Sequence, residues 1–348
     1  MIELVGLSAR VGAFALRDLS FTVPRGAWGI VLGPAGAGKT TLLETVAGVV
    51  EATGGAIRLD GRDVTRAPIE TRGAGLVYQH AYLFPHLSVA ANVRYGVRDD
   101  AIARVVSDLL GVTALEGRHV RSLSGGERQL VALARTLARQ PSVLLLDEPF
   151  SALDPRRRSA VRRAVRGLVR EWGTTVLQVT HDFEEAGLLG DVAVVLDDGR
   201  IQQVAPPSQL FRAPATRVLA DFLGLENVYE GAVATDGSTD ASGVRPVRFT
   251  GQGLVLHAVS DAGEGSGHAV IRAEEIVLSR TASGGSARNA FVGNVIELAG
   301  TGALVRVTVR VGDAIFVAAL TAPSAQALEL AVGAAVHLSF KATAVHLC

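Results

Sequence analysis

One glycine-rich segment of the sequence contains the residue types that bind a phosphate group. The letters GPAGAGKT at residues 33–40 fit the spacing G-x-x-x-x-G-K-[ST] and follow an apolar stretch, WGIVL. Glycines let backbone N–H groups close around phosphate oxygens, and a helix that begins here adds a favourable dipole. The pattern predicts a nucleotide site rather than an ordinary turn. The expected nucleotide-binding residues are Gly33, Pro34, Ala35, Gly36, Ala37, Gly38, Lys39, Thr40 and Thr41.

Two residues of this segment are expected to carry most of its chemistry. Lys39 is predicted to reach the β- and γ-phosphates, and the Thr40 hydroxyl to bind Mg²⁺. Of 34 basic residues in the chain, only Lys39 and Lys341 are lysines. Because arginine is the usual cation of this sequence, a retained lysine indicates a place that needs a compact ammonium group.

Two adjacent acids end a second apolar stretch. The letters VLLLDEP contain Asp147 and Glu148. Neighbouring residues on a strand point to opposite sides, so the two carboxylates can take different roles. We expect Asp147 to support Mg²⁺, directly or through water, and Glu148 to polarise an attacking water. The alternative is a pair of acids that cap the next helix, which the glycine-rich segment makes the weaker interpretation.

Apolar strands alternate with helical stretches up to about residue 225, and these elements must position the residues above. One example is VLLLDEP followed by PRRRSAVRRAVRGLVREW. The alternation predicts an α/β domain with a largely parallel sheet over residues 1–224. Beyond it, short period-two strands such as ALVRVTVRV at residues 303–311 predict a second, all-β domain over residues 225–348, a small barrel or sandwich.

A basic stripe lies on the helix expected after VLLLDEP. Four arginines, Arg158, Arg162, Arg166 and Arg170, follow one another at a spacing of i, i+4. This spacing places them on one helix face. We interpret that face as solvated rather than as a docking surface.

The segment LSGGERQ at residues 123–129 resembles the signature of the ABC ATPases. The other family motifs occur in the family's order: the phosphate segment, Gln79 in VYQH, the signature, DEP, SALD at residues 151–154, and His181 in VTHD. The ordered set extends from residue 33 to 181. The resemblance implies a P-loop NTPase fold with a helical subdomain at about residues 85–139, and ATP with Mg²⁺ as cofactors.

The resemblance also implies roles for individual residues. Ser124, Gly125 and Gly126 would close on the γ-phosphate held by the phosphate segment of a second copy, which makes the working form a head-to-tail homodimer. Glu148 would be the general base, Gln79 would contact the metal or the attacking water, and His181 would orient the γ-phosphate and water. Asp154 would communicate across the dimer. Taken alone, His181 would be an ordinary surface histidine; the ordered motifs favour the catalytic role.

Two aromatic segments are assigned by the same resemblance. Phe14 is the expected platform for the adenine base, with packing in a strand core as the alternative, whereas Phe21 is expected in the core. The stretch VYQHAYLFPHLSVAANVRYG resembles the importer branch of the family. Phe84, Pro85 and Leu87 would there contact a membrane subunit, and a packed turn is the alternative.

The last part of the chain resembles the accessory β-domains of importers. IRAEEI at residues 271–276 is similar to the OB-like domain of importers for oxyanions, sugars, polyamines and iron. From Ser286 onward, SARN, a Thr-x-x-Ser segment and a K-A-T ending resemble small molybdate-binding modules. Ser286, Arg288, Ser324 and Lys341 have the donors that a tetrahedral dianion needs, and a second copy would complete their pocket. The alternative is that this domain only supports the dimer.

The composition excludes several classes of protein. Basic and acidic residues balance at 34 each, so the positive surplus typical of nucleic-acid-binding proteins is absent. No apolar run approaches the ~18 residues of a membrane span. The start of the chain lacks a secretion signal, and the only cysteine is Cys348, which together predict a reducing compartment.

These observations predict the ATP-hydrolysing subunit of an oxyanion importer, for molybdate or tungstate in the first place. The expected partners are integral membrane permease subunits and, indirectly, a periplasmic or extracellular oxyanion-binding protein, with no nucleic acid; the expected place is the cytoplasmic face of the cell membrane. Import of sulfate, ferric iron or polyamine is the alternative within transport. A soluble ABC ATPase acting on nucleic acid or ribosomes is the alternative from another class, and the balanced charge disfavours it.

Overall fold

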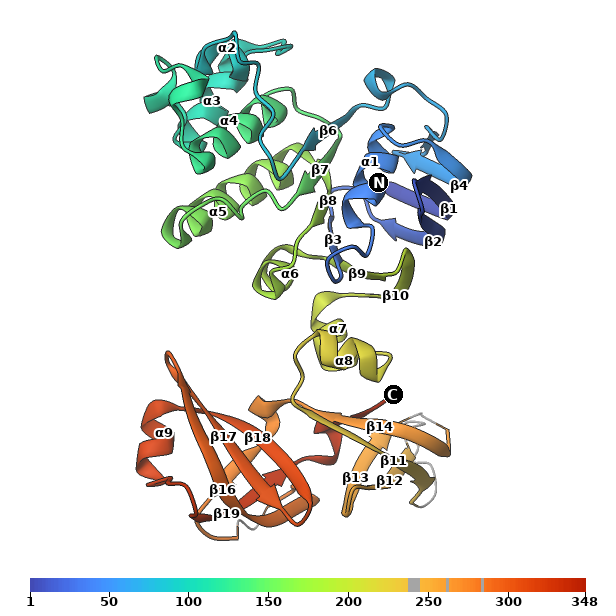
Figure 1. Cartoon of the computed structure of the whole chain (residues 1–348), viewed down its shortest axis with the longest axis vertical. Coiled ribbons are helices and arrows are strands. Elements are labelled where there is room, and N and C mark those ends of the chain that lie inside the picture. Colours follow the sequence, from blue (N-terminus) through green and yellow to red (C-terminus); the bar gives the residue numbers. More distant parts are fainter. Residues whose placement is uncertain (237–244, 261–262, 283–284) are drawn as a thin grey trace. The chain divides into compact units, whose positions relative to one another are not determined.

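The computed structural model describes residues 1–236, 245–260, 263–282 and 285–348. The chain divides into two compact units, Met1–Ser208 and Gln209–Cys348, which are considered separately below (Figure 1). The division falls inside helix α7 (Pro207–Arg212), whereas the sequence places the domain boundary after residue 224, beyond helix α8 (Arg217–Phe222).

The first unit is built on a six-stranded sheet with the order β10-β9-β3-β8-β7-β6. All neighbouring strands are parallel except β9 and β10. Every residue of β3, β7 and β8 is buried, as expected for strands covered on both faces. The predicted parallel α/β sheet is confirmed. The strands are β3 (Trp28–Leu32), β6 (Ala74–Val77), β7 (Val143–Asp147), β8 (Thr175–Val179), β9 (Val192–Asp197) and β10 (Arg200–Ala205).

A second, antiparallel sheet lies beside the first in the same unit. Its order is β2-β1-β4-β5, with β1 (Ile2–Val11), β2 (Phe14–Val23), β4 (Ala52–Leu59) and β5 (Arg62–Asp63). Alternate residues of β1 and β2 are apolar and buried, and they share one hydrophobic core with helix α1 (Lys39–Ala47) and with β7 and β8. Helix α1 is therefore fixed by packing on both sheets. Phe21 belongs to this core, as predicted.

Three helices come between β6 and β7 in the chain. They are α2 (Val89–Val93), α3 (Asp100–Leu110) and α4 (Gly125–Leu137), joined by 3₁₀ turns η2 (Thr113–Leu115) and η3 (Val120–Ser122); a further turn, η1 (Ile69–Thr71), precedes β6. Helices α5 (Pro155–Trp172) and α6 (Phe183–Leu189) follow β7 and β8. Figure 1 shows α2, α3 and α4 grouped together, away from α1.

The second unit contains two five-stranded antiparallel sheets, which confirms the predicted all-β domain. One sheet has the order β13-β12-β11-β14-β20 and the other β15-β19-β16-β17-β18. Residues from both sheets form one core, and Asn227 and Tyr229 on β11 bond to backbone groups of β18. The first sheet comprises β11 (Asn227–Thr235), β12 (Arg245–Gly251), β13 (Leu254–Ser260), β14 (Gly265–Ile271) and β20 (Val345–Leu347). The second comprises β15 (Val277–Ser279), β16 (Asn289–Thr301), β17 (Leu304–Val311), β18 (Ala314–Thr321) and β19 (Ala335–Phe340), with helix α9 (Ala322–Ala327) and turns η4 (Ala273–Glu275) and η5 (Ala342–Ala344).

Within the part of the chain that the structure describes, every helix falls short of the length and apolar character that crossing a bilayer requires.

Candidate functional site

The glycine-rich segment forms a tight loop between β3 and α1. Gly33, Gly36 and Gly38 have φ values of 155°, 82° and 98°, in a region that favours glycine. A Cβ atom at Gly33 would lie 2.0 Å from the carbonyl oxygen of Leu196. Side chains are thus excluded where the loop passes its neighbours, and the backbone can turn its N–H groups toward a ligand at the start of α1.

The Lys39 ammonium group lies over this loop. Its Nζ donates to the carbonyl oxygens of Gly33 and Pro34, at 2.8 and 2.9 Å. Burial lowers the pKa of Lys39, and the nearby carboxylates of Glu148 and Asp147 oppose that shift. A compact cation is therefore held where the loop would meet phosphate oxygens.

Oxygen ligands suited to Mg²⁺ meet beside the loop. The Thr40 hydroxyl donates to Asp147 Oδ2 at 2.8 Å, and Asp147 is only 6% exposed. Burial raises the pKa of Asp147, against the hydrogen bond from Thr40. Among the described residues no group of three or more His, Cys, Asp or Glu side chains could hold a metal. A hydroxyl and one carboxylate nevertheless fit Mg²⁺, which takes few protein ligands and completes its shell with water and phosphate.

Three predicted catalytic side chains meet at Glu148. Gln79 Nε2 donates to Glu148 Oε2 at 2.9 Å, and His181 Nδ1 lies 2.8 Å from Glu148 Oε1. Gln79, Glu148 and His181 follow the carboxyl ends of β6, β7 and β8, which are neighbouring parallel strands. Parallel strands end at one edge of a sheet, and this brings residues far apart in the sequence together.

The arginine stripe of α5 corrects one interpretation from the sequence. Arg162 is 5% exposed, and its guanidinium group pairs with Glu185 at 2.6 Å and with Asp182 at 2.8 Å. The opposite oxygen of Glu185 accepts from Gln178 and from Thr180. The predicted solvated face was wrong at Arg162 because α6 packs against this part of α5. The buried ion pairs hold the segment that carries His181.

A second set of contacts, not identified from the sequence, joins the Gln79 segment to its surroundings. Gln129 on α4 donates from Nε2 to the carbonyl oxygen of Tyr78 at 3.0 Å. The Tyr78 hydroxyl lies 3.3 Å from Glu44 Oε1 on α1. Burial, followed by the charge of Glu44, raises the pKa of Tyr78 to about 12. No motif contains Tyr78 and Glu44 together, so only the fold could associate them.

The signature segment begins α4 and lies away from the phosphate loop of its own chain. Ser124 accepts from the Glu127 N–H, and the Glu127 carboxylate accepts from the Ser124 N–H, which forms a capping box. Ser124 and Gly125 are exposed, and Figure 1 shows α4 apart from α1. Asp154 caps α5 by accepting from Arg157 N at 3.0 Å. The structure thus fixes both segments locally and leaves their outer surfaces open.

The predicted aromatic residues are partly buried. The Phe14 ring packs beside Gly38, where an added Cβ would lie 2.5 Å from Phe14 Cζ. Phe14 is therefore next to the phosphate loop and also part of the core edge. Phe84 contacts Tyr95, with ring centroids 4.4 Å apart, and lies under the Arg135 guanidinium group. Pro85 is exposed and Leu87 is half-buried.

The four predicted oxyanion residues do not meet within one chain. Asn289 pairs with Phe340, so the register places Arg288 next to Lys341 at one end of β16. Ser324 lies on α9, where its hydroxyl bonds Thr321, and Thr321 pairs with Leu304 near the other end of β16. Ser286, Arg288, Ser324 and Lys341 are all exposed. Within a single chain these four residues therefore do not form one group.

Comparisons with known proteins agree with this architecture. The family model described as ABC transporter matches residues 16–151, and the one described as TOBE domain matches residues 285–347. A molybdate/tungstate import ATP-binding protein of Pyrococcus abyssi is 39% identical over 353 residues, which cover 99% of each chain. A sulfate/thiosulfate import ATP-binding protein of Chromobacterium violaceum is 45% identical over 234 residues, 65% of this chain and 64% of that protein.

A solved structure shows the same fold in the first unit. The dimeric structure of a bacterial ABC transporter cassette superposes with a TM-score of 0.55 at 26% identity, and covers 60% of this chain and 99% of that one. The predicted P-loop NTPase fold is confirmed. Since the Pyrococcus abyssi relative is matched along nearly its whole length, the chain belongs to the ABC transporter family, among the import ATP-binding proteins with a C-terminal TOBE domain.

Proposed function

We propose that this chain is the ATP-binding and ATP-hydrolysing subunit of an importer for an oxyanion, molybdate or tungstate. The observation that carries the hydrolytic part of the proposal is the position of Glu148, whose two carboxylate oxygens are engaged by Gln79 and His181. The carboxylate adjoins the Asp147–Thr40 pair and Lys39. A base, a hydrogen-bonding amide and an imidazole beside a phosphate loop are groups that can orient and activate a water for ATP hydrolysis.

In this proposal Glu148 accepts the proton of the attacking water, while Gln79 and His181 hold its carboxylate in place. Lys39 and the loop N–H groups stabilise charge on the phosphates. Thr40, Asp147 and Gln79 would hold Mg²⁺, which would neutralise charge on the β- and γ-phosphate oxygens when bound. Ser124, Gly125 and Gly126 of one copy would close the site of the other, in keeping with the exposed positions of Ser124 and Gly125.

The partners follow from the same proposal. Two copies would form the ATP-binding dimer, and integral membrane permease subunits would bind it at the cytoplasmic face of the membrane. Phe84, Pro85 and Leu87 are the proposed contact, because Pro85 is exposed next to the packed Phe84 ring. A periplasmic or extracellular oxyanion-binding protein would act on the permease and touch this chain only indirectly.

Replacement of the proposed base tests the hydrolytic function. Glu148→Gln should bind ATP as the wild type does, lose turnover by about 10²–10⁴-fold, and accumulate as an ATP-bound dimer. The matched control is Glu184→Gln, because Glu184 is an exposed acid on α6 that is not assigned to the site. If Glu148→Gln hydrolysed ATP at the wild-type rate, Glu148 could not be the general base.

Sulfate import is the second candidate, because a sulfate/thiosulfate relative is 45% identical over 65% of the chain. The full-length match to molybdate/tungstate relatives favours those anions. Calorimetry of the full chain with molybdate, tungstate and sulfate separates the candidates at the C-terminal domain. Saturable heat from molybdate or tungstate that weakens in Lys341→Gln supports the first, whereas preference for sulfate supports the second. Absence of heat from all three would leave a domain that only supports the dimer.

A further inference from the structure

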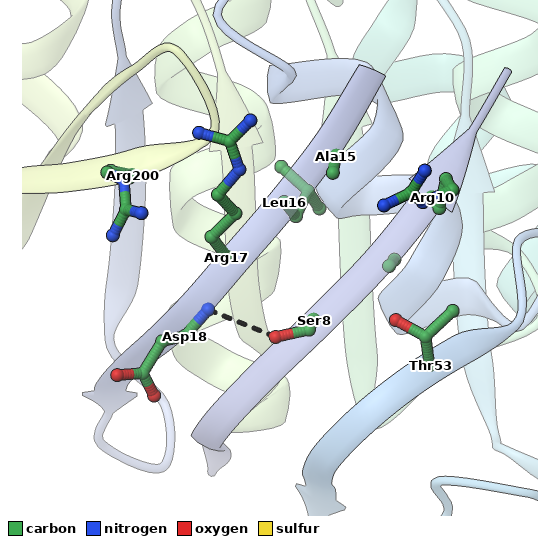
Figure 2. Close-up of a pocket in the computed structure, with 9 residues that line it drawn as sticks. Ser8, Arg10, Ala15, Leu16, Arg17, Asp18, Thr53 and Arg200 are labelled. Carbon is green, nitrogen blue, oxygen red and sulfur yellow. Dashed lines mark hydrogen bonds between the residues drawn. The ribbon is translucent and has the colours of Figure 1, made fainter. Parts of the chain in front are cut away.

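A basic pocket lies on the antiparallel sheet of the first unit, outside the nucleotide site. It is an open hollow of about 320 Å³, lined by polar and apolar residues of β1, β2, β4 and β10. This volume is at the lower end of the ~300–1,000 Å³ typical of small-molecule sites. Figure 2 shows Arg10, Arg17 and Arg200 around it, with the Asp18 carboxylate turned away from Arg10 and Arg17.

The strand register explains why two of these guanidinium groups share one face. Arg10 on β1 pairs with Ala15 on β2, and Arg17 lies two residues further along the same face. Such diagonal neighbours are about 7–8 Å apart, and like charges at cross-strand positions oppose each other. The small Ala15 side chain leaves space between them. The sheet therefore presents two cations to one hollow, and Arg200 adds a third from β10.

Little in the chain neutralises these charges. Within the described ranges, no hydrogen bond or ion pair is found for the side chains of Arg10 and Arg200, and Arg17 reaches only Asp198, at 3.9 Å. The Asp198 side chain is 82% exposed, so that pair is weak. The Ser8 hydroxyl accepts from Asp18 N and keeps its own proton free to donate.

We propose that this pocket binds a small molecule through a phosphate group. Guanidinium groups match the oxygens of a phosphate dianion in geometry and charge, and the hydroxyls of Ser8 and Thr53 add neutral donors. The pocket has room for the phosphate monoester of a metabolite as well as for a free phosphate ion. Either source would use the same phosphate chemistry, and the experiment below separates them.

The wall of the pocket is bonded to the phosphate loop of the ATP site. Arg17 N donates to the carbonyl oxygen of Gly199 at 2.9 Å, and Gly199 N donates to that of Ala37 at 3.1 Å. Gly199 has a φ of 69°, and a Cβ there would lie 2.1 Å from the Ala15 carbonyl oxygen. This close packing leaves little freedom between β2 and the loop. A ligand that fixes Arg17 and Arg200 therefore acts on the segment next to Ala37.

Calorimetry of the full chain tests the proposal, with the ATP site saturated by a non-hydrolysable ATP analogue and Mg²⁺. The probes are glycerol 3-phosphate and inorganic phosphate. We expect saturable binding of at least one probe, weakened about tenfold or more by Arg10→Gln and by Arg200→Gln, because each removes a charged hydrogen-bond donor. Tighter binding of the monoester identifies a metabolite site, and tighter binding of phosphate identifies a free-anion site.

The matched control is Arg58→Gln, because Arg58 is exposed on the same sheet but pairs with Glu3. It should leave probe affinity unchanged. The proposal is overturned if neither probe saturates, if Arg58→Gln weakens binding as much as Arg10→Gln does, or if the probes bind only when the ATP analogue is omitted. If a probe binds but leaves the KM for ATP unchanged, the binding site stands and only the proposed coupling to the ATP site through Gly199 is overturned.

Discussion

At the scale of single residues, the site contains one residue with a strained backbone, Glu148, and one buried carboxylate, Asp147. Glu148 has a φ of 43°, which costs a residue other than glycine of order 1–3 kcal/mol. Its N–H bonds the carbonyl oxygen of Val179 at 3.0 Å, and Gln79 and His181 engage its carboxylate. Next to it, Asp147 is buried with a raised pKa. Both carboxylates are positioned for a ligand at the expense of stability.

The raised pKa of Asp147 gives a prediction about pH. The folded chain holds the Asp147 proton more tightly than the unfolded chain does, so stability falls as pH rises from the ordinary aspartate pKa through the raised one. Asp147→Asn should therefore raise the free energy of unfolding of the nucleotide-free protein at pH 7 and flatten its dependence on pH. Urea unfolding at several pH values measures both effects.

Asp63 provides a control of opposite sign. Hydrogen bonds from the Thr65 hydroxyl and N–H lower its pKa, so its contribution to stability is lost as pH falls. Asp63→Asn should lower stability at pH 7. If Asp147→Asn also lowered it, the proposed burial cost of Asp147 would be wrong.

At the scale of elements, buried polar contacts set the relative positions of the helices that frame the site. Arg162 joins α5 to α6, so the helix that Asp154 caps is tied to the segment after His181. Gly126 lets the start of α4 approach the SALD segment, because a Cβ there would lie 2.9 Å from the Ala152 carbonyl oxygen. Through these two contacts, the signature packs against the SALD segment, and the helix after the SALD segment is bonded to the segment after His181.

Removal of Arg162 should be costly. Arg162→Met leaves the buried Glu185 without its cation and Asp182 with only Arg158, at 4.0 Å. Breaking a buried pair in this way typically costs about 3–5 kcal/mol. Arg170→Met, at an exposed position of the same helix, should change stability by no more than about 0.5 kcal/mol. Urea denaturation measures both variants. If both variants lost the same free energy of unfolding, the ion pairs of Arg162 would add nothing to stability beyond an exposed arginine.

The close approach at Gly126 gives a second prediction at this scale. Gly126→Ala should destabilise the protein by about 1–3 kcal/mol, since the methyl group presses on the Ala152 carbonyl oxygen. Gly125→Ala meets no atom within 4 Å and should be neutral or stabilising, because alanine favours the helix. Thermal unfolding without nucleotide compares the two. If Gly126→Ala left thermal stability unchanged, the SALD segment would have to lie further from α4 than the structure shows.

At the scale of the whole molecule, the residues predicted to share a site lie apart within each chain. The phosphate loop and the signature lie apart in one unit, and the predicted oxyanion residues lie at opposite ends of β16 in the other. Both observations are compatible with the proposed pairing of two copies, in which a second chain would bring these residues together. Pairing would then link ATP binding to oxyanion binding through one assembly.

Mixing two defective chains tests this pairing. In the Glu148→Gln background, Lys39→Ala chains and Ser124→Arg chains should each fail to retain ATP alone. Their mixture should retain one ATP per two chains, because a head-to-tail pair contains one site with both Lys39 and Ser124 intact. Filter retention of labelled ATP measures the stoichiometry. No recovery in the mixture would contradict a site shared between chains.

The sequence alone determined the elements with local signals. The spacing in GPAGAGKT, the apolar run before Asp147 and the period-two strands predicted the phosphate loop, the parallel sheet and the all-β domain, because turns and periodicity depend on neighbours in the chain. The meeting of Gln79, Glu148 and His181 followed from a resemblance, and the structure shows its physical basis in the ends of three parallel strands.

Other features were decided only by tertiary structure. Arg162 has the same helical spacing as exposed Arg170, yet it is buried because α6 covers it. The separation of Ser324 from Lys341 depends on strand pairing, and the arginine pocket joins residues from β1, β2 and β10. Burial and charge pairing are properties of contacts between distant segments, which no local spacing encodes.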